Sequence, residues 1–340
     1  MRKAGFTLAL CATVLAALVV MLGAYTRLTH AGLGCPDWPG CYGFIGVPQT
    51  EDQLAHAAEH FPHAPVEEEK GWNEMVHRYF AGTLGLLILA QALFAWRRRD
   101  VADQPVKLPL LLLAVVIVQA AFGMWTVTLK LWPQVVTAHL LGGFTTLSLQ
   151  ALLTLRLSGR WPALKKPPTQ ALRGLAAAGL LAVLGQVALG GWVSSNYAAV
   201  ACVDLPTCHG EWWPAMDFAN GFHLTQHIGP NYLGGQLDSD ARTAIHVSHR
   251  LGAILVSALL LLLIAALWRA RLTGLAQALA LLLVVQVSLG ISNVLLHLPL
   301  AVAVAHNAGG AALLIMLVAI NYRLRQPANE LQRSRVLQPA

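Results

Sequence analysis

Long apolar runs, separated by short polar segments, dominate the chain from one end to the other. A helix that crosses a bilayer needs about 20 mostly apolar residues, and eight stretches meet this length. Only helices and closed barrels satisfy their backbone hydrogen bonds in lipid, and none of the stretches alternates like a β-strand. The pattern therefore predicts eight transmembrane helices, at residues 5–25, 74–96, 108–129, 134–156, 173–193, 243–268, 273–294 and 300–322.

The basic residues indicate how these helices are oriented. If the N-terminus is cytoplasmic, the inner segments hold 17 of the 23 Lys and Arg residues, which is the bias expected of cytoplasmic loops. Both termini are then cytoplasmic, and the two long loops, 26–73 and 194–242, face outwards. Only 11% of residues are charged, against about 25% in soluble proteins. The net charge of +7 lies in short inner loops, which argues against a nucleic-acid partner.

The chain also contains an internal repeat. A shift of 167 residues superimposes cysteines, glycines, a glutamine and a histidine of the two halves, while His77-Arg78 matches His249-Arg250 at a shift of 172 because the second outer loop is longer. Both copies cross the membrane in the same direction, so a pseudo-twofold axis along the membrane normal relates them. The pairs are Gly23/Gly190, Cys35/Cys202, Asp37/Asp204, Pro39/Pro206, Cys41/Cys208, Gln119/Gln286, Gly123/Gly290, His139/His306 and Gly142-Gly143/Gly309-Gly310.

The repeat predicts an all-α integral membrane protein whose eight helices form two four-helix bundles. We place the first bundle at residues 1–160 and the second at 161–340. The polar inner segment 158–170 is the longest internal linker and joins them.

Four histidines lie inside predicted spans: His77, His139, His249 and His306. Each is about four to seven residues from the outer end of its helix, hence at similar depth by the helical rise of 1.5 Å per residue. Two imidazoles facing one another in a bundle can bind a haem iron from opposite sides. The alternative is that each histidine hydrogen-bonds a neighbouring helix, but two per repeat at matching positions favour haem.

The neighbours of these histidines suggest how a haem would be accommodated. The glycine pairs three and four residues after His139 and His306 would leave space for a flat ring, although close helix packing is the alternative. Arg78 and Arg250 could pair with haem propionates, or extend to the membrane surface. His246 occupies the position that Glu74 holds in the first half.

Glu74 is the feature that distinguishes the first half, because no carboxyl precedes His249 by one turn. Glu74 and His77 are three residues apart and share a helix face. A carboxyl near a bound porphyrin could move protons or stabilise charge. The alternative is a charge in the first turn of the helix, with Asn73 as the N-cap.

Outer-loop residues offer weaker signals. Two C-x5-C pairs, Cys35/Cys41 and Cys202/Cys208, lie on the oxidising side, where disulfides persist. We predict two disulfides rather than metal sites, while dithiol exchange stays open as a role. Some loop histidines have a spacing that could hold a metal, although solvated loop residues are the simpler interpretation: His56, His60, His63, His209, His223 and His227.

Together these features resemble the haem A synthase family, and the stretch Thr29–Cys41 is similar to its bacterial members. The resemblance covers essentially the whole chain. It implies that haem O is converted to haem A, the C8 methyl being oxidised to a formyl through a hydroxylated intermediate, in support of haem–copper oxidase assembly. It also implies a multi-pass protein of the bacterial inner membrane, with its haem sites towards the periplasm.

The resemblance further implies a division of labour between the halves. His249 and His306 would hold haem b, His77 and His139 would hold the substrate haem O, and Glu74 would be catalytic. The expected partners are haem O, membrane lipid, the farnesyltransferase that produces haem O and an electron donor; a homo-oligomer is compatible with it. Two other classes also explain the histidines: a membrane di-haem b-type electron carrier, and a haem transporter or chaperone.

Overall fold

The computed structural model describes residues 3–159, 164 and 167–326. Eight long helices within these residues are apolar and long enough to cross a membrane, which confirms the predicted spans. They are α1 (Phe6–Leu28), α3 (Glu68–Arg97), α4 (Lys107–Thr128), α5 (Pro133–Ser158), α6 (Gln170–Ser195), α8 (Ser239–Arg269), α9 (Thr273–Leu295) and α10 (Leu300–Leu324). Two short helices lie in the loops, α2 (Glu51–His60) and α7 (Phe218–Gly221).

Two helices begin earlier than hydropathy predicts, because polar residues start them. The first turn of α3 carries Glu68 and Glu69, which interact favourably with the positive end of the helix dipole. Helix α8 is capped by Asp238, whose side chain accepts a hydrogen bond from a backbone N–H of the first turn. Glu74 therefore lies in the second turn of α3, and the alternative that made Asn73 the N-cap is wrong.

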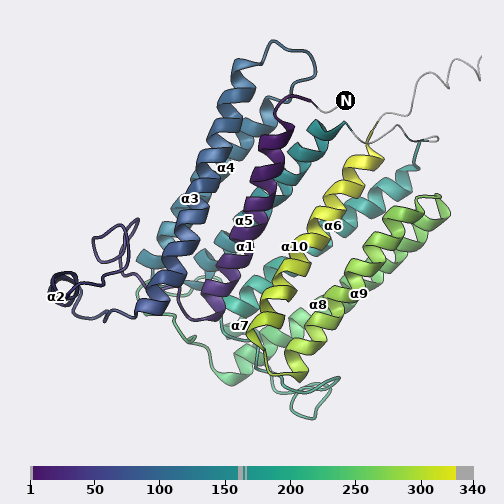
Figure 1. Cartoon of the computed structure of the whole chain (residues 1–340). Helices are drawn as coiled ribbons and strands as arrows, with labels where there is room; N and C mark the ends of the chain where they lie inside the picture. The colour runs from purple at the N-terminus through teal and green to yellow at the C-terminus, as the bar shows by residue number, and fades with distance from the viewer. Residues whose placement is uncertain (1–2, 160–163, 165–166, 327–340) are drawn as a thin grey trace, which may run out of the picture.

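The eight long helices pack as two rings of four (Figure 1). In the first ring α1 contacts α3 and α5, and α4 closes the ring; in the second, α6 contacts α8 and α10, and α9 closes it. Helices α1, α5, α6 and α10 form the interface between the rings. This arrangement is compatible with the pseudo-twofold relation. The domain boundary at 160/161 lies outside the described residues, so the division into 1–160 and 161–340 stays a prediction.

The N-terminal end of α1 and the C-terminal end of α10 lie at one end of the bundle, and the two long loops with α2 and α7 lie at the other (Figure 1). The second long loop also reaches over the first ring. The indole N–H of Trp132, at the start of α5, donates to the carbonyl of Gln226 (3.1 Å), and the backbone N–H of Tyr232 donates to the carbonyl of Lys130 (3.0 Å). The loops therefore cover one end of both rings.

The two long loops share one local structure. Cys35–Cys41 and Cys202–Cys208 form disulfide bonds, which confirms both predicted pairs. Asp37 accepts hydrogen bonds from the backbone N–H groups five and six residues later (2.6 and 2.8 Å). Asp204, its counterpart at the shift of 167, accepts the equivalent two bonds (2.8 and 3.0 Å). The repeat therefore extends from the helices into the loops.

Candidate functional site

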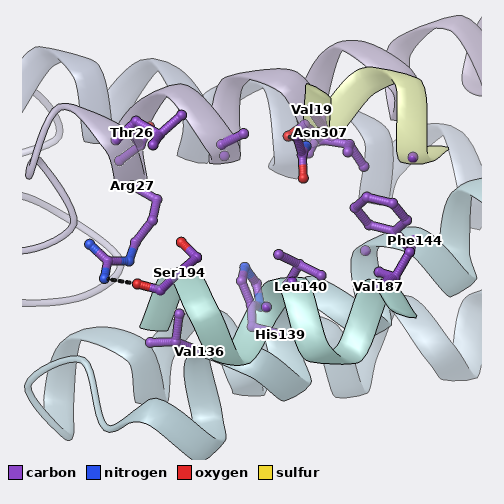
Figure 2. Close-up of a pocket in the computed structure, with 18 of the residues that line it drawn as sticks. Val19, Thr26, Arg27, Val136, His139, Leu140, Phe144, Val187, Ser194 and Asn307 are labelled. Atoms are coloured by element: carbon purple, nitrogen blue, oxygen red, sulfur yellow. Dashed lines mark hydrogen bonds between the residues drawn. The ribbon is translucent and has the colours of Figure 1, made fainter. Parts of the chain in front are cut away.

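One cavity of about 2530 Å³ is lined by all four histidines of the predicted spans. Its walls come from both rings (Figure 2), and most of the lining surface is apolar. Sites for a single small ligand have volumes of roughly 300–1,000 Å³, so this cavity has room for more than one large planar ligand. The structure thus brings together the residues that the sequence predicted as haem ligands: His77, His139, His249 and His306.

Each of these imidazoles packs against a glycine of a neighbouring helix. A Cβ atom added at any of the four glycines would lie 3.0–3.3 Å from Cε1 of the facing ring, closer than ordinary van der Waals contact. A larger residue would therefore displace the ring. The pairs are Gly23 with His77, Gly123 with His139, Gly190 with His249, and Gly290 with His306. These four glycines are two of the matched pairs of the internal repeat, but the sequence did not show that they contact the histidines.

The two members of each glycine pair after His139 and His306 have different surroundings. A Cβ at Gly142 would lie 1.9 Å from Oε1 of Gln119, and a Cβ at Gly309 would lie 2.2 Å from Oε1 of Gln286. The first glycine of each pair therefore makes room for a glutamine side chain rather than for a flat ring. The second glycine of each pair does line the cavity.

Three glutamines make hydrogen bonds to the histidines. The amide nitrogen of Gln119 is 3.0 Å from Nδ1 of His139, and that of Gln186 is 3.0 Å from Nδ1 of His249. The Gln286 amide nitrogen instead lies 3.4 Å from Nε2 of His306, whose buried Nδ1 has no hydrogen-bond partner among the described residues. No such contact reaches His77, whose buried Nδ1 has no hydrogen-bond partner in the part of the chain that the structure describes.

Glu74 lies at the wall of the cavity and is only 5% exposed. One carboxylate oxygen accepts a hydrogen bond from the guanidinium of Arg78 (2.5 Å), and the other accepts one from the backbone N–H of Cys35 (3.0 Å). The carboxylate thus joins α3 to the first disulfide loop. It shares the cavity with His77, as the sequence predicts.

Arg78 and Arg250 hold the two disulfide loops over the helix ends. Arg78 donates to the carbonyls of Asp37 (3.0 Å) and Gly40. Arg250 donates to the carbonyls of Thr207 (2.8 Å) and Cys202 (3.0 Å). Both arginines also line the cavity, so their pairing with haem propionates stays a prediction.

His246 takes the place of Glu74 in the second half. Its side chain is buried, and Nδ1 lies 2.8 Å from the carbonyl oxygen of Ala198. It therefore joins α8 to the second outer loop, as Glu74 joins α3 to the first, but it supplies no carboxylate. Glu74 and His246 thus have the same structural role and differ in chemistry.

Two of the loop histidines contact one another. His56 and His60 stack with their ring centroids 4.0 Å apart, and Nδ1 of His60 lies 3.0 Å from the carbonyl oxygen of His56. Across residues 3–159, 164 and 167–326, no group of three or more His, Cys, Asp or Glu residues could hold a metal ion.

Arg27 links the two rings, and the sequence analysis missed it. Its guanidinium donates to the backbone carbonyl of Ser194 (2.5 Å; Figure 2) and lies 3.9 Å from the ring centroid of Tyr197, on which His30 stacks. At the shift of 167, Arg27 matches Ser194 and His30 matches Tyr197. Residues related by a twofold axis contact one another when they lie close to that axis. The shift of 167 could therefore have predicted that Arg27 contacts Ser194 and that His30 contacts Tyr197.

The residues of the cavity fit haem. Four imidazoles, the usual axial ligands of haem iron, border one largely apolar space. Each imidazole faces a glycine of a neighbouring helix, so no side chain occupies the space beside the ring. Arg78 and Arg250 line the same space beside the disulfide loops and bring positive charge to it.

Comparison with known proteins identifies the family. Residues 6–318 match the family of cytochrome oxidase assembly proteins designated COX15-CtaA. The chain belongs to this family. A relative from Shewanella oneidensis, named heme A synthase, is 49% identical over 317 residues, which is 93% of this chain and 95% of the relative.

More distant family members carry the same name. A heme A synthase from Caulobacter vibrioides is 27% identical, over 96% of this chain and 97% of its own length. One from a Chelativorans species is 31% identical, over 88% of this chain and 84% of its own length. The resemblance drawn from the sequence motifs is confirmed, and the chain is a multi-pass membrane protein of this family.

Proposed function

We propose that this chain is a haem A synthase, which oxidises the C8 methyl of haem O to a formyl through a hydroxylated intermediate. The observation that carries this proposal is the cavity itself. It is lined by four histidines, and among the described residues only one pair of them has a buried carboxylate beside it. Membership of the family and the name of its relatives support the same activity.

Within this activity, we assign the histidines by the asymmetry of the halves. His77 and His139 would hold the substrate haem O, because Glu74 lies one turn from His77 in the same cavity wall. His249 and His306 would hold haem b as a resident cofactor. Bound iron–porphyrin supplies the one-electron and oxygen chemistry that side chains lack.

Glu74 would act on the reacting edge of the substrate. Hydrogen bonds from Arg78 and Cys35 occupy one lone pair on each carboxylate oxygen and fix the direction of the side chain. The remaining lone pairs can accept a proton, or stabilise positive charge, as the methyl carbon is oxidised. Because Arg78 also binds the loop carbonyls, the same contacts hold a loop over the site and limit the access of water.

Several features of the biological setting follow from this activity as further proposals. The termini would be cytoplasmic and the haem sites periplasmic, in a bacterial cell membrane. Residues 1–160 would form the substrate domain and 161–340 the haem b domain. Arg78 and Arg250 would reach the propionates, since Nε of Arg250 is buried without a partner among the described residues. The farnesyltransferase that makes haem O and an electron donor are the protein partners that the reaction calls for.

The experiment that tests the proposal separates it from the two other classes that the histidines suggested. The chain is expressed with a supply of haem O, purified, and its extracted haems are identified by mass. A synthase yields haem b together with sub-stoichiometric haem O, its hydroxylated form or haem A. Two identical, permanently bound haems would instead indicate an electron carrier, and unaltered haem O a transporter or chaperone.

A further inference from the structure

Arg27 is a cation in the cavity wall for which the described part of the chain supplies no acid. We propose that Arg27 binds a carboxylate of the substrate, namely the haem O propionate on the pyrrole ring that also carries the C8 methyl. Arg27 is then a positioning residue for the reacting edge of the porphyrin. This inference rests on the proposed function, because that function assigns haem O to the first half.

The position of Arg27 on α1 places it in the first-half site. Arg27 follows Gly23, the glycine on which the His77 ring packs, by four residues. Residues four apart lie on the same face of a helix, one turn from each other, and all three of these residues line the cavity. Because α1 ends at Leu28 and leads into the first long loop, Arg27 lies on the loop side of His77.

The charge of Arg27 is not neutralised by the described residues. Its guanidinium donates to the backbone carbonyl of Ser194, which carries no charge, and its Nε is buried without a hydrogen-bond partner among residues 3–159, 164 and 167–326. A cation removed from water is costly unless it pairs with an anion. Arg78, which is expected to meet a propionate as well, already shares its charge with Glu74. Arg27 is therefore the arginine of the first-half site that lacks an anion.

Two contacts hold the Arg27 guanidinium in place before any ligand binds. Figure 2 shows the side chain extending from α1 across the cavity to Ser194, to which it is hydrogen-bonded at 2.5 Å. The guanidinium also lies over the Tyr197 ring, 3.9 Å from its centroid, and His30 stacks on that ring. A guanidinium can bind a carboxylate through two parallel hydrogen bonds. Because the side chain is already ordered, it loses less conformational entropy when it does so.

The second half has a serine at the position of Arg27. The shift of 167 matches Arg27 with Ser194, which follows Gly190 by four residues as Arg27 follows Gly23. Gly190 packs on His249 in the second half. A serine hydroxyl offers no charge to a carboxylate. Like Glu74, the cation at this position therefore belongs to the half that we assign to the substrate.

The chemistry of haem O connects this carboxylate to the reaction, because the C8 methyl shares its pyrrole ring with one of the two propionates. Arg27 and Glu74 lie at matching levels of neighbouring helices. The hydroxyl of Thr26 donates to the backbone carbonyl of Asn73 (3.2 Å), and Arg27 and Glu74 directly follow these two residues. Both line the cavity. A propionate held by Arg27 therefore keeps the reacting pyrrole at the end of the cavity where Glu74 lies.

The test compares haem O with its dimethyl ester, in which neither propionate is charged. Full-length protein that retains haem b is purified from cells without a haem O supply and titrated with each ligand, and the dissociation constants are obtained from absorbance. Arg27→Gln removes the charge and keeps an amide that can donate to Ser194. We expect the ratio of the two dissociation constants, which measures the preference for free carboxylates, to fall at least about tenfold in this variant. A purely structural link would weaken both ligands equally, so an unchanged ratio would overturn the proposal.

A milder variant decides the question even where Arg27→Gln does not accumulate. Arg27→Lys keeps the charge between the rings, but an ammonium cannot reproduce the two parallel hydrogen bonds of a guanidinium. The propionate bending mode of bound haem O in the resonance Raman spectrum should therefore shift between wild type and Arg27→Lys, and an unchanged mode would overturn the proposal. Both measurements concern binding without formyl formation, so failure of this inference is distinguishable from failure of the proposed synthase activity.

Discussion

Replacing a glycine that packs on an imidazole by alanine should disturb one haem and leave the other intact. Gly290 of α9 is the clearest case, because an added Cβ would lie 3.1 Å from Cε1 of His306. Gly274 provides the control on the same helix, since no described atom lies within 4 Å of a Cβ placed there. In a helix interior alanine is favoured over glycine by roughly 1 kcal/mol, so helix propensity cannot explain a loss of haem from Gly290→Ala.

The size of the effect follows from the geometry. Ordinary van der Waals contact begins at 3.4 Å, so the His306 ring must move by about 0.3 Å. This movement is larger than the variation of about 0.2 Å that is found in metal–ligand distances. The ring cannot simply turn aside, because Gln286 contacts it from the neighbouring turn of α9. A disturbed ligand shell typically costs about 10–100-fold in affinity, or about 1.4–2.8 kcal/mol at 1.4 kcal/mol for each factor of ten.

The assay is haem b per chain after purification, together with the fraction of low-spin haem in the absorption spectrum. The affinity of Gly290→Ala for haem b should be about 10–100-fold lower than that of the wild type, so less haem b remains after purification. Gly274→Ala should keep the wild-type haem b content. Gly23→Ala, whose Cβ would lie 3.0 Å from His77, should lower bound haem O and spare haem b. Equal haem b content and spectra in Gly290→Ala and Gly274→Ala would refute the reasoning.

Three further predictions concern charged residues. Glu74→Gln keeps the shape of the side chain and removes its charge, so haem b should remain while haem O or its hydroxylated form accumulates; a normal haem A yield in the extracted haems would exclude a chemical role. The Thr207 hydroxyl and neighbouring backbone N–H groups lower the pKa of Asp204 from 3.8 to about 2. The folded state therefore favours the carboxylate, and its contribution to stability is present above pH 3.8 and lost as the pH falls through about 2. The difference in thermal unfolding temperature between wild type and Asp204→Asn should shrink over that range, and a constant difference would contradict this cause. Arg27→Leu removes a charged hydrogen bond to Ser194 between the rings and should cost roughly 1.5–3 kcal/mol, seen as a lower midpoint of thermal unfolding in detergent; an unchanged midpoint would mean that the link is dispensable.

Hydropathy predicted all eight spans because length and apolar composition decide whether a helix crosses a bilayer. It misplaced the starts of α3 and α8, since these are set by polar residues such as Glu68 and Asp238 beyond the apolar run. This difference changed the interpretation of Glu74. A helix that begins at Glu68 places the carboxylate a full turn inside, where it contacts a loop and a cavity instead of capping the helix.

The repeat made the four histidines recognisable, because chance does not duplicate their positions. Sequence spacing could not show which group lies beside a glycine. We therefore predicted that Gly142 leaves space for a flat ring, whereas the side chain of Gln119 occupies that space. The contact between Gln186 and His249 likewise required the distance between them, which only the packed helices supply.

The measurement that tests the central claim most directly is the haem b content of two matched variants, His306→Ala and His139→Ala. Both residues lie six positions into their helices and line the same cavity, so the substitutions are closely comparable. If the second half holds haem b and the first half holds haem O, His306→Ala loses haem b, whereas His139→Ala keeps haem b and fails to produce haem A. Full retention of haem b by His306→Ala, or its loss from His139→Ala, would contradict the account.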